Sequence, residues 1–261
     1  MNRKEYWNKD YAEYWKEVTD EAEDIDNERT CINKLSGNDF KTPDMATVID
    51  FFEMMHYGLD ETLLDYGCGL GRFYPFLSSK CNYHGIDISD VMIEHCRRQF
   101  SQDADRFLVA EGENLPYSDG YFDKVICSGV FDACYQEQAL SEMLRITKTG
   151  GYLLISGKND HYFLNDEEAL LAEINARKKG HPNYFTDVAY MVKQVEKYAE
   201  VVVEKYALRR GDYGKRLFKD SMPDIFYEWV LIIRKTSNRH PEFVKFSDAY
   251  SKTWKELKDS K

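Results

Sequence analysis

The chain has 261 residues and a formal net charge of −11, and 43% of its residues are hydrophobic. This length predicts one domain with elaborations, or a core with a small cap, and the hydrophobic content can fill a substantial core. The negative charge argues against a nucleic acid as partner, because phosphate binding requires a basic surface. The six cysteines form no C-x-x-C pair, and no apolar run reaches membrane-spanning length. We therefore expect reduced core thiols, no metal site, no membrane partner, and a cytoplasmic monomer or homodimer.

The first 58 residues are predicted to form a helical cap or lid (1–58). Aromatic and apolar residues recur at helical spacing from Trp7 to Val18, which predicts one amphipathic helix. A second apolar stripe over residues 48–55 predicts another helix before the core begins.

The remaining residues, 59–261, are predicted to form the core domain. From residue 61 to residue 157, short apolar strands alternate with helices, which predicts an α/β fold with a parallel sheet covered on both faces. The predicted strands cover residues 61–66, 82–87, 106–110, 123–128 and 152–157. The predicted helices begin at residues 70 and 89, and a third covers residues 136–147.

After the fifth strand, an insert on the acceptor side is predicted over about 158–198. Asn165 and Glu168 suggest a capping box for a helix that ends at Lys178, and Thr186 is expected to open a second helix. Two more strands and a last helix are predicted at residues 199–206, 226–234 and 241–258.

The first predicted strand ends in an acid followed by three alternating glycines. Asp65, Gly67, Gly69 and Gly71 form the pattern D-x-G-x-G-x-G. Glycine permits positive φ and lets a ligand approach bare backbone, and a helix start offers free N–H groups. A dinucleotide-binding loop needs a small residue where this chain has Arg72, which argues against a nicotinamide-dependent oxidoreductase. The pattern instead resembles the first motif of the class I S-adenosylmethionine (SAM) methyltransferases.

Two further segments extend this resemblance to methyltransferases of the type 11 kind. Asp87 ends the second strand about 20 residues after Gly67, where this architecture places a carboxylate on ribose hydroxyls. The segment from Glu111 to Asp123, E-G-E-N-L-P-Y-S-D-G-Y-F-D, is similar to the family's D-A-E-x-L-P-F-x-D-x-x-F-D. The resemblance covers roughly residues 61–157. It implies a Rossmann-like seven-stranded sheet of order 3-2-1-4-5-7-6 whose last strand is antiparallel.

The resemblance also implies SAM as cofactor and S-adenosylhomocysteine as product. The expected contacts are Asp65, Gly67 and Gly69 with the methionine moiety, Asp87 with the ribose, Ile88 and Met92 beside the adenine, Glu111, Gly112 and Glu113 at the adenine edge, and Ser128 and Gly129 facing the methionine tail and the sulfonium. Glu111 departs from the family's Asp by one methylene, so the adenine contact is expected to shift.

The N-terminal aromatic face has two interpretations. It can simply pack on the core, or it can close as a lid over SAM and the acceptor, where an aromatic ring attracts the sulfonium through a cation–π interaction. The lid candidates are Tyr6, Tyr14 and Trp15, and the last two are also predicted cofactor contacts.

Catalytic candidates follow the fourth and fifth strands. Methyl transfer is an in-line displacement, so the protein supplies alignment, with a base only where the nucleophile carries a proton. His161 and Asp132 are the candidate bases, because both are predicted to lie beside the methyl group, and histidine titrates near neutral pH. The reserve candidates are His181 and Tyr135, and an anionic acceptor would instead need orientation by Lys158, Arg209 or Arg210.

The sequence predicts a SAM-dependent methyltransferase that acts on oxygen or nitrogen of a small polar metabolite. A sugar, nucleotide-sugar or phosphorylated intermediate of surface glycan biosynthesis fits the charged, Tyr-rich insert. No N/D-P-P-Y segment or Pro-Cys pair suggests a nucleic-acid base as acceptor. The alternative is a catalytically inactive SAM-binding regulatory or partner subunit, which would be expected to show a damaged glycine motif or a missing ribose acid.

Overall fold

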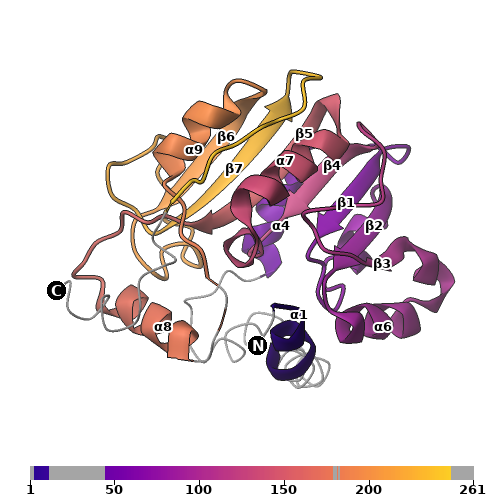
Figure 1. The fold of residues 1–261 in the computed structure, drawn as a ribbon, viewed down its shortest axis with the longest axis horizontal. Coiled ribbons are helices and arrows are strands. Elements are labelled where there is room, and N and C mark those ends of the chain that lie inside the picture. The colour runs from indigo at the N-terminus through magenta and orange to yellow at the C-terminus, as the bar shows by residue number, and fades with distance from the viewer. Residues whose placement is uncertain (1–2, 12–44, 179–180, 182, 248–261) are drawn as a thin grey trace.

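The computed structural model describes residues 3–11, 45–178, 181 and 183–247. Seven strands form one sheet of order β3-β2-β1-β4-β5-β7-β6, with helices on both faces (Figure 1). β7 pairs antiparallel with both neighbours, whereas the other pairs are parallel, which confirms the predicted fold class. The strands are β1 Thr62–Tyr66, β2 Asn82–Asp87, β3 Phe107–Val109, β4 Phe122–Cys127, β5 Thr147–Lys158, β6 Ala199–Ala207 and β7 Glu228–Lys235.

Five helices lie close to their predicted ranges, whereas the short 3-10 helices that begin at residues 101 and 131 were not predicted. The helices before β5 are α1 Arg3–Tyr6, the π-helix η1 Trp7–Tyr11, α4 Met45–Glu53, α5 Tyr74–Leu77, α6 Asp90–Gln99, η2 Ser101–Arg106, η3 Phe131–Ala133 and α7 Gln136–Ile146. Those after β5 are α8 Glu167–Lys178 and α9 Val188–Val195.

Two predicted helix caps are wrong by one residue. The Asp166 carboxylate, not Asn165, accepts the Ala169 N–H at 3.1 Å and caps α8. Asp187, not Thr186, caps α9 by accepting the Tyr190 N–H at 2.9 Å. A carboxylate is a stronger acceptor than an amide or hydroxyl at a helix N-terminus, where it also meets the positive dipole end.

Two predicted helices differ more. The helix expected from residue 70 is only the four-residue α5, because Gly71 still has a positive φ of 76° that a helix cannot contain. Residues 241–247 are not helical, and the rest of the predicted last helix lies outside the described residues.

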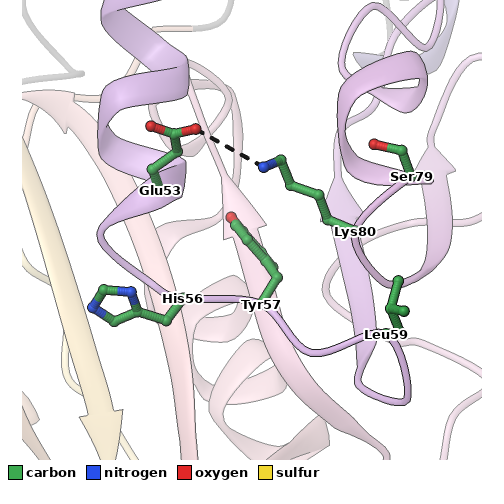
Figure 2. A pocket seen from close by; sticks show the side chains of 6 residues that line it. All are labelled: Glu53, His56, Tyr57, Leu59, Ser79 and Lys80. Carbon is green, nitrogen blue, oxygen red and sulfur yellow. Dashed lines mark ion pairs between the residues drawn. The ribbon is translucent and has the colours of Figure 1, made fainter.

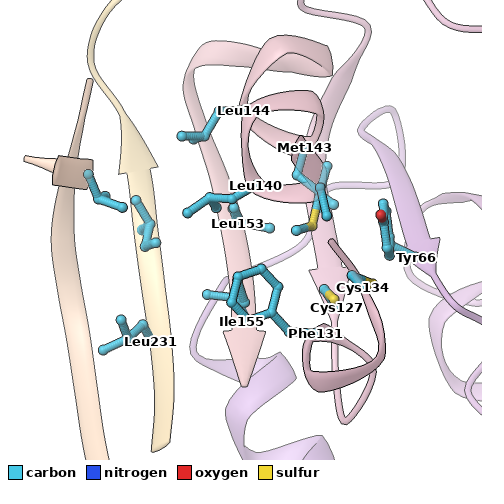
Figure 3. Packing of buried hydrophobic residues seen from close by; sticks show 14 of the residues in the cluster. Tyr66, Cys127, Phe131, Cys134, Leu140, Met143, Leu144, Leu153, Ile155 and Leu231 are labelled. Carbon is cyan, nitrogen blue, oxygen red and sulfur yellow. The ribbon is translucent and has the colours of Figure 1, made fainter. Parts of the chain in front are cut away.

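The sheet separates two apolar clusters. On one face α7 and α9 cover the sheet, and Figure 3 shows Leu140, Phe131 and Ile155 packed between α7 and the strands. On the other face α4, α5 and α6 cover it, with Phe52 and Leu63 fully buried. Burial on both faces fixes the parallel strands rigidly, so the loops at their carboxyl ends have a firm base. Among the described residues, no helix is both long and apolar enough to cross a membrane.

Candidate functional site

The loop after β1 is a tight turn built by glycine. Gly67, Gly69 and Gly71 have φ values of 80°, 55° and 76°, which side-chain-bearing residues rarely adopt. The N–H groups of Gly67 and Cys68 both donate to the Ile86 carbonyl at 2.8 Å, so the loop is tied to the end of β2. A Cβ on Gly67 would lie 2.5 Å from a methyl carbon of Val130, so glycine is required there for space as well.

Asp87 is held at the tip of β2 by backbone donors. Its two carboxylate oxygens accept the N–H groups of Gly69 at 3.0 Å and Ser89 at 2.9 Å. Burial raises the pKa of Asp87, and these N–H donors oppose the rise. Each oxygen keeps a lone pair, so the carboxylate is oriented and can still accept from ribose hydroxyls.

Asp65 lies deeper than expected. Its side chain is only 2% exposed, and it accepts a hydrogen bond from the Tyr83 hydroxyl at 2.9 Å. Burial raises the pKa of Asp65 to about 7, with the Tyr83 hydrogen bond lowering it. The carboxylate therefore also holds β1 to β2, a structural contact that the motif did not suggest.

Open space lies over two glycines beyond the strand tips. Among the described residues, a Cβ on Gly129 would meet nothing within 4 Å, and one on Gly69 would meet only the Met92 sulfur at 3.9 Å. The Gly129 N–H donates to the Ser156 hydroxyl at 2.9 Å, which fixes the turn after β4. Bare backbone flanking an oriented carboxylate fits the amino-acid and ribose parts of SAM, so these residues suit the cofactor that the sequence implies.

The predicted adenine edge is arranged differently from expectation. Glu111 is exposed, whereas Gly112 packs so closely that a Cβ would lie 1.8 Å from the Tyr66 hydroxyl oxygen. The Glu113 carboxylate accepts hydrogen bonds from the two terminal guanidinium nitrogens of Arg3, at 2.5 and 2.6 Å. It also accepts the Tyr135 backbone N–H at 2.9 Å. The Glu113 carboxylate thus binds the N-terminal segment in this structure.

That N-terminal segment, α1 with η1, bridges two sides of the site (Figure 1). Lys4 pairs with Asp90 at the start of α6 at 3.0 Å, and the Tyr6 hydroxyl contacts the His181 ring at 2.9 Å. Tyr6 is buried, which is compatible with packing on the core and with a lid. Tyr14 and Trp15 lie outside the described residues, so the lid interpretation and the division at residue 58 stay predictions.

The two candidate bases have contrasting surroundings. Asp132, in η3 after β4, is part-buried and accepts the Lys158 backbone N–H at 2.9 Å. Burial raises the pKa of Asp132 to about 7, although Lys158 lowers it. His161 has a side chain that is 69% exposed and pairs with Asp160. The burial of Asp132 thus moves its pKa toward neutrality, whereas the His161 side chain lies mostly in solvent.

The other polar candidates are largely engaged in the fold. Arg209 lies over the Phe163 ring and donates to Asn165 at 3.1 Å. Sequence analysis missed Glu173 and Glu228, which also lie on this side of the sheet. A glutamate at the first position of the apolar run E-W-V-L-I-I was an available signal for Glu228.

A separate pocket lies at the opposite edge of the sheet. Figure 2 shows its lining side chains at the end of α4 and the turn after α5, where Lys80 pairs with Glu53 at 3.9 Å. The lining residues precede β1 and β2 in the chain, so they lie at the amino ends of the strands. Ligands of open α/β sheets bind at the carboxyl ends, and we therefore assign this pocket no part in the site.

Comparisons with known proteins agree with this geometry. Residues 64–155 match the family described as "Methyltransferase domain". The tRNA (carboxymethyluridine(34)-5-O)-methyltransferase of Arabidopsis thaliana is 34% identical over 113 residues, which are 42% of this chain and 26% of that protein. The matches span only 26% to 54% of the first curated relatives.

Solved structures show the same fold. A SAM-dependent methyltransferase of Thermotoga maritima has a TM-score of 0.59 at 20% identity, covering 91% of this chain and 100% of its own. Geranyl diphosphate C-methyltransferase of Streptomyces coelicolor, solved with S-adenosyl-L-homocysteine, has a TM-score of 0.56 at 15% identity, covering 73% and 79%. Residues 64–155 thus match the methyltransferase domain, and the chain has the fold and strand order of these SAM-dependent methyltransferase structures.

Proposed function

We propose that this protein transfers a methyl group from SAM to an oxygen or nitrogen of a small polar molecule. The observation that carries the proposal is the juxtaposition at the carboxyl ends of the strands. Open backbone at Gly69 adjoins the oriented Asp87 carboxylate, and the part-buried Asp132 follows the same strand as the open backbone of Gly129. The residues suited to bind the cofactor and the carboxylate suited to accept a proton thus follow neighbouring strands of the sheet.

SAM, when bound, supplies a methyl group already activated by its sulfonium. Transfer would then require the acceptor's lone pair to be aligned with that methyl group, opposite the carbon–sulfur bond. The chain's own residues orient the partners, which is the main source of rate in such a displacement. Where the acceptor atom carries a proton, Asp132 can take it, because its pKa of about 7 lets the carboxylate form at neutral pH.

The finer features of the acceptor remain predictions. A sugar, nucleotide-sugar or phosphorylated acceptor, the absence of a nucleic-acid partner and a cytoplasmic location all rest on the sequence alone. The relative named above is a tRNA methyltransferase, so the acceptor class differs within the wider family. The rival, an inactive SAM-binding subunit, gains no support from the intact glycine loop and Asp87.

Calorimetric titration with S-adenosylhomocysteine tests the proposal directly, with NAD as the control ligand. We expect one-site micromolar binding of S-adenosylhomocysteine and none of NAD. Absence of binding to folded protein would contradict the proposal. Binding without methyl transfer to any acceptor in a broad metabolite panel would favour the inactive-subunit rival.

The Asp87→Ala variant tests the ribose contact. We expect S-adenosylhomocysteine binding to weaken by about 1.5–3 kcal/mol, the usual effect of losing a charge-assisted hydrogen bond. Asp105→Ala, at an exposed aspartate in η2, is the matched control and should leave the affinity unchanged. Equal affinities for the two variants would remove Asp87 from the site.

A further inference from the structure

A group of charged side chains meets where β5 ends and β7 begins. Lys158 of β5 pairs with Glu173 of α8 at 2.9 Å, and the Glu173 side chain is 1% exposed. The Tyr227 hydroxyl donates to Glu173 at 2.6 Å and accepts from Arg210 at 3.3 Å. Asn183 also donates to Glu173. Glu173 is therefore fully satisfied, and it engages the Lys158 ammonium.

The two other carboxylates of this group have fewer hydrogen-bond donors than Glu173. Glu228 opens β7 directly opposite Lys158, and its Oε2 is buried without any hydrogen-bond partner among the described residues. Asp132 accepts one backbone N–H, from Lys158. A buried carboxylate oxygen without a donor is costly, so its retention needs an explanation.

The charges of the group are also unbalanced. Among the described residues that act most strongly on Glu228, the carboxylates Asp132 and Glu173 stand with Glu228 against the cations Lys158 and Arg210, which leaves one carboxylate in excess. Arg210, Lys158, Asp132 and Glu173 all act electrostatically on Glu228, and burial raises the pKa of Glu228 to about 7. Burial also raises the pKa of Asp132. These described residues therefore supply less positive than negative charge around Glu228.

The chemistry of the missing partner follows from this imbalance. An anionic acceptor would meet the surplus carboxylate, and the two cations of the group already contact Glu173 and Tyr227. A neutral hydroxyl can donate a hydrogen bond but leaves the charge uncompensated. An ammonium group supplies both several N–H donors and a positive charge.

We propose that Glu228 and Asp132 bind the protonated amino group of the methyl acceptor, which makes the acceptor a small amine. The inference rests on the proposed methyltransferase function and specifies its substrate class. An amino sugar meets it, whereas a phosphorylated acceptor without an amine does not. Lys158 and Glu173 then support the site by holding Glu228's surroundings in place.

Matched amine and alcohol probes test the assignment. The protein saturated with S-adenosylhomocysteine is titrated calorimetrically with tyramine and 4-hydroxyphenethyl alcohol, ethanolamine and ethylene glycol, and cyclohexylamine and cyclohexanol. We expect at least one amine to bind about tenfold or more tighter than its alcohol. Amines that bind no better than alcohols in every pair, including no binding of either, would overturn the assignment.

Variants separate a site from a bulk charge effect. Glu228→Gln keeps the side-chain shape and should abolish the amine preference while leaving S-adenosylhomocysteine affinity unchanged. Glu200→Gln is the control and should retain the preference. Glu200 lies on an exposed part of β6, where its carboxylate pairs with Arg234 of β7. An amine preference that survives Glu228→Gln would also overturn the assignment.

A parallel titration without S-adenosylhomocysteine distinguishes the two proposals. Amine preference in protein that does not bind S-adenosylhomocysteine would contradict the proposed function and leave the amine site supported. Tight S-adenosylhomocysteine binding without amine preference would support the proposed function and contradict the amine site.

Discussion

The proposed cofactor side and the proposed acceptor side of the sheet are held by different kinds of groups. At the cofactor side, backbone N–H groups and glycines do the positioning, and Asp87 accepts two backbone donors. At the acceptor side, side chains from β5, β7, η3 and α8 meet, and Glu228 keeps an unpartnered oxygen. The first region is complete before a ligand arrives, whereas the second has hydrogen-bonding capacity and charge left over.

This contrast separates binding of a cofactor from specificity for an acceptor. Backbone geometry binds the one cofactor in every reaction cycle, so it gains from being rigid and fully satisfied. Specificity for an acceptor comes from buried polar groups that a wrong ligand would leave unpaired.

The largest effect is expected from closing the glycine loop. Gly67→Ala places a Cβ 2.5 Å from a methyl carbon of Val130, which is a steric clash. It also forces alanine into a φ of 80°, which alanine rarely adopts. We expect a loss of about 3 kcal/mol or more in the free energy of unfolding, measured by urea denaturation. Gly150→Ala has a φ of 85° but open space, and should cost only about 1 kcal/mol. Equal losses would mean that φ alone, and not the Val130 contact, requires glycine.

The same contrast explains how much the sequence could predict. The cofactor side is local in the chain, since the glycine motif and Asp87 lie within 23 residues and carry recognisable spacing. The strand order was likewise predictable, because it follows from the family resemblance and is confirmed. Glu228 could not be assigned from spacing, because it meets Asp132 and Glu173 only through the antiparallel pairing of β5 with β7. The predicted N-caps of α8 and α9 are wrong by one residue, because each has two adjacent polar residues that could both cap the helix.

The next effect concerns catalysis on the acceptor side. Asp132→Asn should slow methyl transfer about 100-fold if this carboxylate takes the acceptor's proton. In the unaltered protein, the rate should rise with pH through about 7 and then level, because only the ionised carboxylate can act. The variant should lose that rise. His161→Ala should leave both rate and profile nearly unchanged, and a 100-fold loss there would instead make His161 the base.

A smaller effect with the opposite sign is expected in stability. The pKa of Glu228 is raised to about 7 from its ordinary 4.5, so the folded state holds its proton more tightly than the unfolded state. Its charge then destabilises the fold, fully above pH 7 and not at all below about pH 4.5. Glu228→Gln should therefore stabilise the ligand-free protein by about 1–3 kcal/mol at pH 8 and by little at pH 4.5. Thermal unfolding at both pH values measures this, and destabilisation at pH 8 would indicate a purely structural glutamate.

The smallest effect is expected from the contact that joins α1 to the cofactor side. Arg3 and Glu113 form a two-pronged ion pair with side chains only 16% and 10% exposed, so it is better shielded from water than a surface pair. If α1 covers the bound cofactor, Arg3→Ala should weaken S-adenosylhomocysteine binding by about 1 kcal/mol, through faster dissociation in stopped-flow measurements. Lys4→Ala removes the exposed pair with Asp90 and should change the affinity by less than about 0.5 kcal/mol. Identical dissociation rates in both variants would mean that α1 packs beside the site without closing it, because the shielded contact would then contribute no more than the solvated one.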